Sequence, residues 1–541
     1  MPKRPFPPPA RRKKTPKAPE TVDEYLAVAV ELEESGERWR SGDVSKAGRF
    51  FVQAITAYET TLARYPDSFD ARYNRARLLY TLTQLPLPSS FFPPGSTAED
   101  RLLAAVAAHK ECNELERDSS DVLFNYGQTL SSLGEFYAHK EAADGDDGGS
   151  ELKRLLPAKE AFEAAWQILQ QCLAIQEREY KATLAQTAAF ENDGDGDDVL
   201  MDADDGGVRL RPSRRSSAAS SQSSGSGNGN TTQWAAIVEP TTTDTLLDTT
   251  LAMLDVHTSI LGLGGAASAS TLFTEAYLHT LTATADDTLA NYILPLAGAL
   301  HREVDIDATV LAEREMEAAL ARANYLTALA ELRYHLALTT PDDWETVIAS
   351  AFHPVTLPVP DNTATTQRTI DLSTSWMGLC DRSTAYTALA TAIASSQPTQ
   401  AWRLGSAAAR DLKAATDLSP EKSRAEVYLA RANLELLRAQ IPVAGVDAAS
   451  RALLRKNASV YCRNAVAASS SGLIGAVEGG KVKEVVEEAR IKEALIRWED
   501  GNAEGIQSLI QSGIAADRIR AVLRAAVEEG LFSRDLLNQP L

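Results

Sequence analysis

Cysteine is scarce in this chain of 541 residues, and its spacing excludes several kinds of site. The four cysteines, Cys112, Cys172, Cys380 and Cys462, are separated from one another by at least sixty residues, and none has a CxxC partner. This spacing argues against a zinc ribbon, a redox motif and a disulfide framework. We therefore predict that the four cysteines are small, buried hydrophobic residues.

Long apolar runs and catalytic motifs are also missing. No stretch reaches the ~18 uninterrupted apolar residues of a transmembrane helix, and no apolar segment follows the N-terminus as in a secretory signal. The seven histidines show no HExxH spacing, no GxGxxG follows a predicted strand, and neither GxxxxGK[ST] nor GxSxG occurs. We expect a soluble, intracellular protein that is not an enzyme and that has no catalytic residue, metal or cofactor.

Aromatic residues make up only 6% of the chain, whereas apolar residues make up 44%. The apolar runs are rich in Ala and Leu and are interspersed with Glu, rather than with the β-branched and aromatic residues that favour strands. The composition therefore predicts an all-α protein.

Positive charge is scarce outside one short segment. The chain contains 74 acidic residues and 54 Lys or Arg, for a net charge of −20, yet residues 1–19 contain seven basic residues and no acidic one. An acidic body repels phosphate backbones and attracts basic partners. We expect the folded part to avoid nucleic acid and to bind proteins, with basic proteins favoured.

The basic N-terminal segment is rich in proline and cannot form a packed element. Its densest cluster consists of Arg11, Arg12, Lys13 and Lys14. Such a flexible row of positive charge is typical of a nuclear-import signal, and the alternative is a solubilising or RNA-binding tail. The protein is accordingly expected in the nucleus, in the cytoplasm or in both.

Helical periodicity begins after this tail, and helical hairpins recur along the chain. Gly42 precedes Ala47, Phe51 and Ala54, whose spacings of four and three place them on one helix face. Small residues on such a face allow a neighbouring helix to approach closely. A second helix is expected to follow Pro66.

The same pattern returns in two further places. Gly127 and Gly134 lie seven residues apart in the stretch 120–136, and Ala408, Ala415 and Pro420 stand at corresponding spacings in 400–437. Together with 42–80, these stretches resemble the tetratricopeptide repeat, a helix-turn-helix unit of ~34 residues. The resemblance implies a superhelix that recognises proteins rather than one that catalyses a reaction.

The tetratricopeptide family also raises the question of a carboxylate clamp for heat-shock chaperone C-termini. The resemblance would align Glu33 and Glu37 with its first Lys and Asn, Asn74 with its next Asn, and Asp121 and Asn125 with its last Lys and Arg. Only Asn74 matches, and carboxylates would repel an acidic peptide, so such peptides are disfavoured as partners.

A different peptide groove remains a hypothesis for the same helices. Its candidate residues are Arg72, Asn74, Arg75, Arg77 and Asn125. The alternative is that these side chains are solvated positions on a helix surface.

Several segments interrupt the helical pattern. We therefore predict an all-α superhelix in two blocks, with disordered insertions. Residues 244–338 are predicted as helices of undetermined pairing, 339–371 as irregular, and 480–535 as helical. The predicted segments are a basic, proline-rich disordered tail at 1–20, an N-terminal block at 21–190, an acidic then Arg/Ser-rich disordered linker at 191–232, and a C-terminal block at 233–541.

Two functional hypotheses follow from this organisation. The first is an adaptor that acts as an escort or assembly chaperone for a basic client, such as a ribosomal or chromatin protein. The second is a scaffold subunit of a multiprotein complex, in which the acidic segments only improve solubility.

The basic cluster generates a first prediction. Changing Arg11, Arg12, Lys13 and Lys14 together to Ala removes the only dense positive charge, so a fluorescent fusion should shift from the nucleus towards the cytoplasm. Microscopy of the wild-type and variant fusions measures the ratio of nuclear to cytoplasmic fluorescence. An unchanged nuclear signal, or a wild type that never enters the nucleus, would contradict the assignment.

Overall fold

The first helical hairpin sets the pattern of the molecule, for which a computed structural model describes residues 19–140, 149–192, 241–302, 306–357, 368–469 and 478–539. Helix α1 (Val22–Arg40) begins at a capping box in which Thr21 and Glu24 satisfy each other's backbone N–H groups. Helix α2 (Val44–Arg64) returns antiparallel, so that the hydroxyl of Tyr65 donates to the carbonyl of Glu20 across 2.8 Å.

A glycine allows the two helices of this hairpin to pack closely. A Cβ atom at Gly36 would lie 2.5 Å from the ring of Phe51, which is fully buried together with Ala47 and Ala54. Gly42 lies in the turn between the helices, where a Cβ would contact nothing within 4 Å. The turn glycine was visible in the sequence pattern, but the glycine at the crossing is Gly36.

Two more hairpins stack on the first. They consist of α3 (Phe69–Gln84) with α4 (Ala98–Leu115), and of α5 (Ser120–His139) with α6 (Gly149–Asn192). Cβ atoms at Gly127 and Gly134 of α5 would each lie 2.7 Å from side-chain atoms of α6, those of Leu169 and Phe162. The glycine-phenylalanine contact of the first hairpin therefore recurs in the third.

The sequence left the pairing of the central helices open. In the structure, α7 (Thr243–Gly262) packs against α11 (Ala308–His335). Arg314, near the start of α11, contacts Asp244 near the start of α7. Beyond the end of α7, a Cβ at Gly264 would clash with a methyl carbon of Leu332, near the end of α11. The two helices thus run in the same direction, side by side.

The segment between α7 and α11 forms the returning arm of the α7 hairpin. It packs against α7 and contains α8 (Ala269–Leu272), α9 (Glu275–Thr288), a π-helical turn (Leu289–Ile293), α10 (Leu294–Ala299) and the 3₁₀ turn Leu300–Arg302. Helix α11 in turn pairs with α12 (Pro341–Ala351).

The remaining hairpins continue the stack towards the C-terminus. They are α13 (Trp376–Ile393) with α14 (Pro398–Leu418), α15 (Arg424–Gln440) with α16 (Ala448–Ala468), and α17 (Glu478–Glu499) with α18 (Glu504–Gln511) and α19 (Ala516–Glu528). Ala408 and Ala415 are fully buried on α14, and Pro420 follows that helix before the 3₁₀ turn Glu421–Ser423.

The described parts of the region 339–371, residues 339–357 and 368–371, are less irregular than the sequence predicts. Helix α12 begins at a capping box formed by Thr340 and Asp343. Strands β1 (Val355–Leu357) and β2 (Arg368–Ile370) then pair antiparallel, with Val355 opposite Ile370. A proline at the first turn and a threonine N-cap favour a helix start, and this signal outweighs the prolines that follow it.

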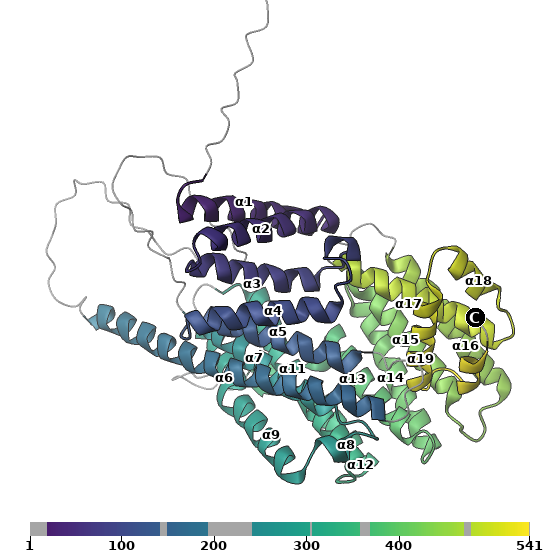
Figure 1. The fold of residues 1–541 in the computed structure, drawn as a ribbon. Coiled ribbons are helices and arrows are strands. Elements are labelled where there is room, and N and C mark those ends of the chain that lie inside the picture. The colour runs from purple at the N-terminus through teal and green to yellow at the C-terminus, as the bar shows by residue number, and fades with distance from the viewer. Residues whose placement is uncertain are drawn as a thin grey trace, which may run out of the picture.

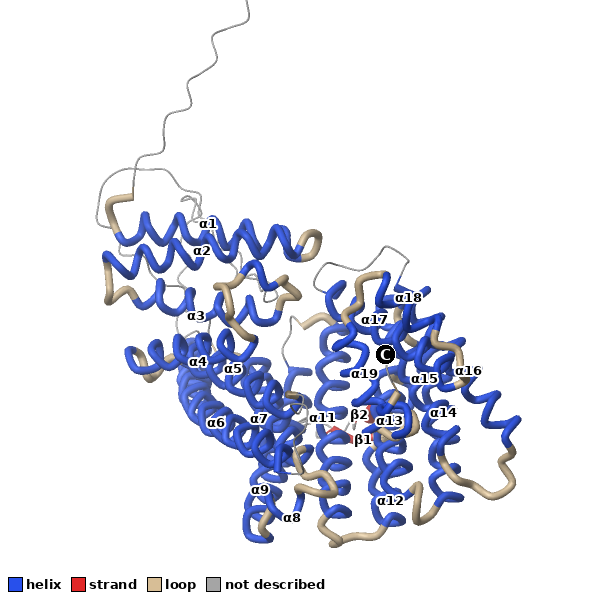
Figure 2. Tube along the Cα trace, turned by 45° about the vertical axis from the view of Figure 1, so that its right-hand side comes forward, coloured by secondary structure: helices blue, strands red, loops and turns tan. Residues whose placement is uncertain are grey.

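The repeated hairpins confirm the all-α, tetratricopeptide-like fold (Figures 1 and 2). We call α1, α3, α5, α7, α11, α13, α15 and α17 the first helices, since each opens a hairpin and, from α3 onward, each packs against the next along the row. The largest core cluster extends from Leu130 of α5 to Ile441 after α15, so it joins the helices on both sides of residues 193–240. The division into two blocks remains a prediction.

The cysteines largely fit the prediction of small buried residues. Cys112, Cys172 and Cys462 are buried, whereas Cys380 is half-buried. Burial raises the pKa of the Cys112 thiol to about 11 and that of the Cys462 thiol to about 12. These thiols are protonated at neutral pH and therefore poor nucleophiles.

The α5–α6 crossing generates a second prediction. Gly127→Leu should lower the thermal unfolding midpoint, because the added side chain must displace Leu169, and overpacking costs about 1–3 kcal/mol. Gly42→Leu is the matched control, since its side chain enters open space. If Gly127→Leu is as stable as the control or more stable, the close crossing is wrong.

Candidate protein-binding face

Polar side chains link consecutive first helices near the N-terminus. Arg77 of α3 forms an ion pair with Glu33 of α1, and Glu33 also accepts a 2.9 Å hydrogen bond from the hydroxyl of Tyr58. Burial and the charge of Glu33 raise the pKa of Tyr58, so this tyrosine remains a donor at neutral pH. The pair fixes α3 beside α1.

Two tyrosines of α3 make the corresponding links to α5. The amide of Asn125 donates to the hydroxyl of Tyr73 at 2.9 Å, and burial raises the pKa of Tyr73 to about 12. The hydroxyl of Tyr80 lies 2.9 Å from that of Ser132. These contacts connect helices that are about fifty residues apart in sequence.

The four candidate groove residues on α3 lie on different sides of that helix, and the fifth, Asn125, belongs to α5. Arg77 and Asn74 face the buried Glu33–Tyr58 pair, and Asn125 lies on the neighbouring helix beside Tyr73. Arg72 instead approaches Glu111 of α4 at 3.8 Å, and Arg75 approaches Glu59 of α2 at 3.2 Å. The three arginines are already paired with carboxylates, and they do not point into one groove.

The aligned clamp positions also differ from the sequence-based expectation. Glu33 is only 8% exposed and its charge is balanced by Arg77. It therefore does not supply the repulsion of an acidic peptide that the sequence predicts. Glu37 pairs with Arg40 in the same helix. The prediction that heat-shock peptides are disfavoured therefore rests on the lack of the clamp's cationic side chains at the aligned positions, and not on repulsion by Glu33.

A second set of polar residues lies on the central first helices. Asp244, Asp248 and Asp255 are spaced by four and seven residues along α7, so they share one helix face. Glu317 and Glu331 lie fourteen residues apart on α11, close to four full turns, so they also share a helix face. Together with Asp381 of α13, these six residues constitute what we call the carboxylate face.

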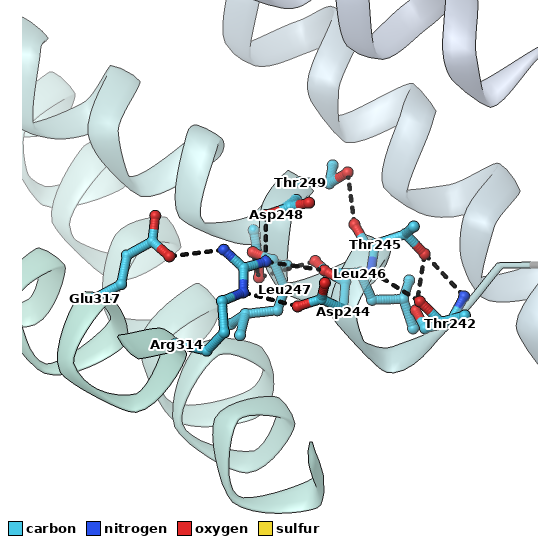
Figure 3. Close-up of polar contacts among 10 residues, drawn as sticks. Thr242, Asp244, Thr245, Leu246, Leu247, Asp248, Thr249, Arg314 and Glu317 are labelled. Atoms are coloured by element: carbon cyan, nitrogen blue, oxygen red, sulfur yellow. Dashed lines mark hydrogen bonds and ion pairs between the residues drawn. The ribbon is translucent and has the colours of Figure 1, made fainter. Parts of the chain in front are cut away.

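One arginine crosses from α11 to α7 within this face (Figure 3). The Nε atom of Arg314 lies 2.7 Å from Asp244, its Nη2 pairs with Asp248, and its Nη1 lies 2.6 Å from Glu317. The Arg314 side chain is only 16% exposed, so three carboxylates share one well-shielded cation. This leaves a local excess of negative charge.

Burial shifts the pKa values of two carboxyl groups of this face. Burial raises the pKa of Asp248, although its bond to Arg314 acts in the opposite direction. Burial also raises the pKa of Asp381. Asp255 is exposed to solvent and forms no hydrogen bond or ion pair with any described residue. A carboxylate without a cationic partner is stabilised by an added cation.

A cavity of about 230 Å³ adjoins the carboxylate face between α11, α12 and α13. Asp381 accepts a 2.9 Å hydrogen bond from Asn324 at its edge, which links α13 to α11. The cavity is lined by Asn324, Thr327, Ala328, Glu331, Trp344, Asp381, Thr384, Ala385 and Ala388.

A second hollow of about 310 Å³ occupies the equivalent position between α3, α4 and α5. Its lining carries both charges, from Arg101 and Glu135, together with the ring of Phe136. Arg101 lies over the ring of Phe92, 4.1 Å from its centre. This hollow is less acidic than the cavity beside α13.

The sequence analysis missed the carboxylate face. The spacing of Asp244, Asp248 and Asp255 on one helical stretch was a readable signal. Arg314 and Asp381 could not be assigned to it, because their positions depend on how α7, α11 and α13 pack. The candidate import residues Arg11 to Lys14 lie outside the described residues.

Other kinds of site find no support within the described ranges. No group of three or more His, Cys, Asp or Glu side chains there could hold a metal ion. None of the helices in those ranges has the length and apolar character needed to cross a lipid bilayer.

Comparison with known proteins gives short or weak likenesses. No family model matches the chain. Over 133 residues it is 32% identical to the UPF0656 protein C926.02 of Schizosaccharomyces pombe. That match covers 25% of this chain and only 28% of the length of the relative.

Among solved structures, the hypoxic regulator of sterol synthesis Nro1, described as a nuclear import adaptor, is 14% identical with a TM-score of 0.33. That match covers 86% of this chain and 93% of Nro1. Yeast Tom70 is 12% identical with a TM-score of 0.24, and the match covers 95% of this chain and 98% of Tom70. Both TM-scores are low, and neither structure bears on what this chain binds.

The Arg314 cluster generates a third prediction. Arg314→Gln leaves Asp244, Asp248 and Glu317 without their shared cation, and should lower the free energy of unfolding by about 1–3 kcal/mol. Urea titration measures the change. Arg410→Gln, which removes an exposed arginine of α14, is the control and should change it by less than about 0.5 kcal/mol. Equal effects in the two variants would show that the cluster does not hold α11 to α7.

Proposed function

We propose that this protein is an adaptor that escorts a basic client, and that a Lys/Arg-rich segment of the client binds along the carboxylate face. Ribosomal and chromatin proteins are the clients whose charge best fits this role. The tetratricopeptide-like stack supports the general role, because such repeats present extended surfaces for protein recognition.

The observation that carries the proposal is the imbalance of charge on α7, α11 and α13. Six carboxylates line three adjacent first helices, and Arg314 is the cation that bridges α7 and α11 there. Arg314 is shared by three of these carboxylates, and Asp255 forms no ion pair with a described residue. Asp381 accepts its hydrogen bond from the neutral amide of Asn324. A basic segment would supply the missing charge.

The face near the N-terminus is less suited to this role. Its arginines on α3 are each engaged by a glutamate, so it offers neither free cations for an acidic peptide nor a comparable row of carboxylates. We therefore assign client binding to the central first helices rather than to the predicted groove around Asn74 and Asn125.

If binding is electrostatic, the affinity for a basic peptide should depend on the salt concentration and on the charge of Asp255. A synthetic 15-residue peptide rich in Lys and Arg should bind the full chain, and its affinity should fall steeply as salt increases. Asp255→Lys should weaken binding about tenfold, equivalent to about 1.4 kcal/mol. Fluorescence anisotropy of the labelled peptide measures both effects.

The matched control is Asp67→Lys, which makes the same change of charge on the loop between α2 and α3. It should alter the affinity less than about twofold, because exposed charges more than about 10 Å away are screened. Equal losses in the two variants would indicate nonspecific attraction to the whole acidic body. Absence of any binding to the basic peptide would favour the scaffold hypothesis.

A further inference from the structure

The cavity between α11, α12 and α13 combines an apolar floor with an acidic edge. Ala328 of α11 and Ala385 and Ala388 of α13 line it with small side chains, beside the indole of Trp344. Such a lining accommodates an aliphatic chain, which gains free energy when its methylene groups leave water. The cavity opens between consecutive first helices, where a bound segment would pass.

Two carboxylates stand at the edge of this cavity. Asp381 uses Oδ2 to accept the hydrogen bond from Asn324, and no described residue contributes a cation to it. Glu331 lies 3.8 Å from His335 on the same helix and is 44% exposed on its side chain. Burial raises the pKa of Asp381, as expected for a carboxyl that lacks a cationic partner.

A third polar group in the lining also lacks a partner. The indole N–H of Trp344 forms no hydrogen bond with any described residue, although this side chain is only 1% exposed. Its ring packs against Tyr334, with centroids 5.3 Å apart, so it is held in place. A buried donor without an acceptor is unfavourable, and a carbonyl oxygen of a bound ligand would satisfy it.

These features match one kind of amino-acid side chain. A ligand must present a cation to Asp381 and Glu331, methylene groups to the alanines, and a nearby carbonyl to Trp344. Lysine and arginine both have the methylene groups, but the planar guanidinium has five donors in a fork that can contact two carboxylates at once. The ammonium of lysine is a compact point charge and fits this edge less well.

We infer that the cavity holds the side chain of one arginine of the basic partner. This inference rests on the proposed function, and adds to it a defined anchor residue within an otherwise electrostatic contact. The cavity would then select among basic segments, since only a segment with an arginine at the matching position fills it.

A peptide series tests the inference. In the 15-residue basic peptide, each arginine is replaced in turn by citrulline, its neutral analogue, and by lysine. At one position citrulline should weaken binding about tenfold and lysine about threefold, whereas at the other positions each change should have less than about a twofold effect. With Asp381→Asn protein, the penalty at the special position should disappear.

Filling the cavity provides an independent variant. Ala388→Leu should block the arginine and weaken the unmodified peptide about tenfold, while the steep salt dependence of the remaining contact persists. A thermal melt checks that this variant is folded. Asp381→Asn is close in shape to the native side chain and keeps the test valid if Ala388→Leu does not fold.

The outcomes separate the two proposals. One outcome is that replacing any arginine of the peptide has the same small effect on affinity, and that Asp381→Asn and Ala388→Leu bind the peptide as the wild type does. This would overturn the inference that the cavity holds an arginine, but it would leave the escort function standing. Free arginine or spermidine that displaces the peptide at equal concentration would identify a small-cation site and overturn the inference. Failure of every basic peptide to bind would remove the escort function itself.

Discussion

The side-by-side packing of the first helices is the constraint on which the rest of the molecule depends. Polar side chains connect several neighbours in this row: Arg77 to Glu33, Tyr73 to Asn125, Arg314 to Asp244, and Asn324 to Asp381. Lys492 of α17, which is 2% exposed, makes an equivalent contact with Asn433 of α15. Partly buried polar pairs tolerate little displacement, because separating them leaves charged or polar groups unsatisfied. They therefore fix the position of one hairpin relative to the next.

The same row distributes charge unevenly, and this difference separates two surfaces. On α3, each of Arg72, Arg75 and Arg77 is paired with a glutamate, so positive and negative groups are balanced. On α7 and α11, Arg314 alone serves Asp244, Asp248 and Glu317, and Asp255 forms no ion pair with a described residue. The balanced surface holds α3 beside its neighbours, and the unbalanced surface is the one to which we propose that a cationic partner binds.

The sequence predicted the elements of the fold better than their assembly. The small residues at Ala47, Ala54 and Ala408, and the glycines of α5, identified helical hairpins because periodicity is a local property. The crossing glycine Gly36 and the pairing of α7 with α11 depend on contacts between distant segments. For the candidate site, the three aspartates of α7 could have been recognised as one helix face. The link from Asp244 and Asp248 to Glu317 through Arg314, and the cavity that Glu331 and Asp381 line beside Trp344, depend on the packing of helices distant in sequence.

The central claim is that a basic segment occupies the row of first helices at α7, α11 and α13. Amide hydrogen exchange of the full chain, with and without a saturating basic peptide, tests it most directly, because bound surfaces exchange more slowly. The account predicts slower exchange in peptides from α7, α11 and α13. It predicts little change in α4, α14 and α16, each of which is the second helix of its hairpin. Protection confined to those second helices, or to the α3–α5 region, would contradict it.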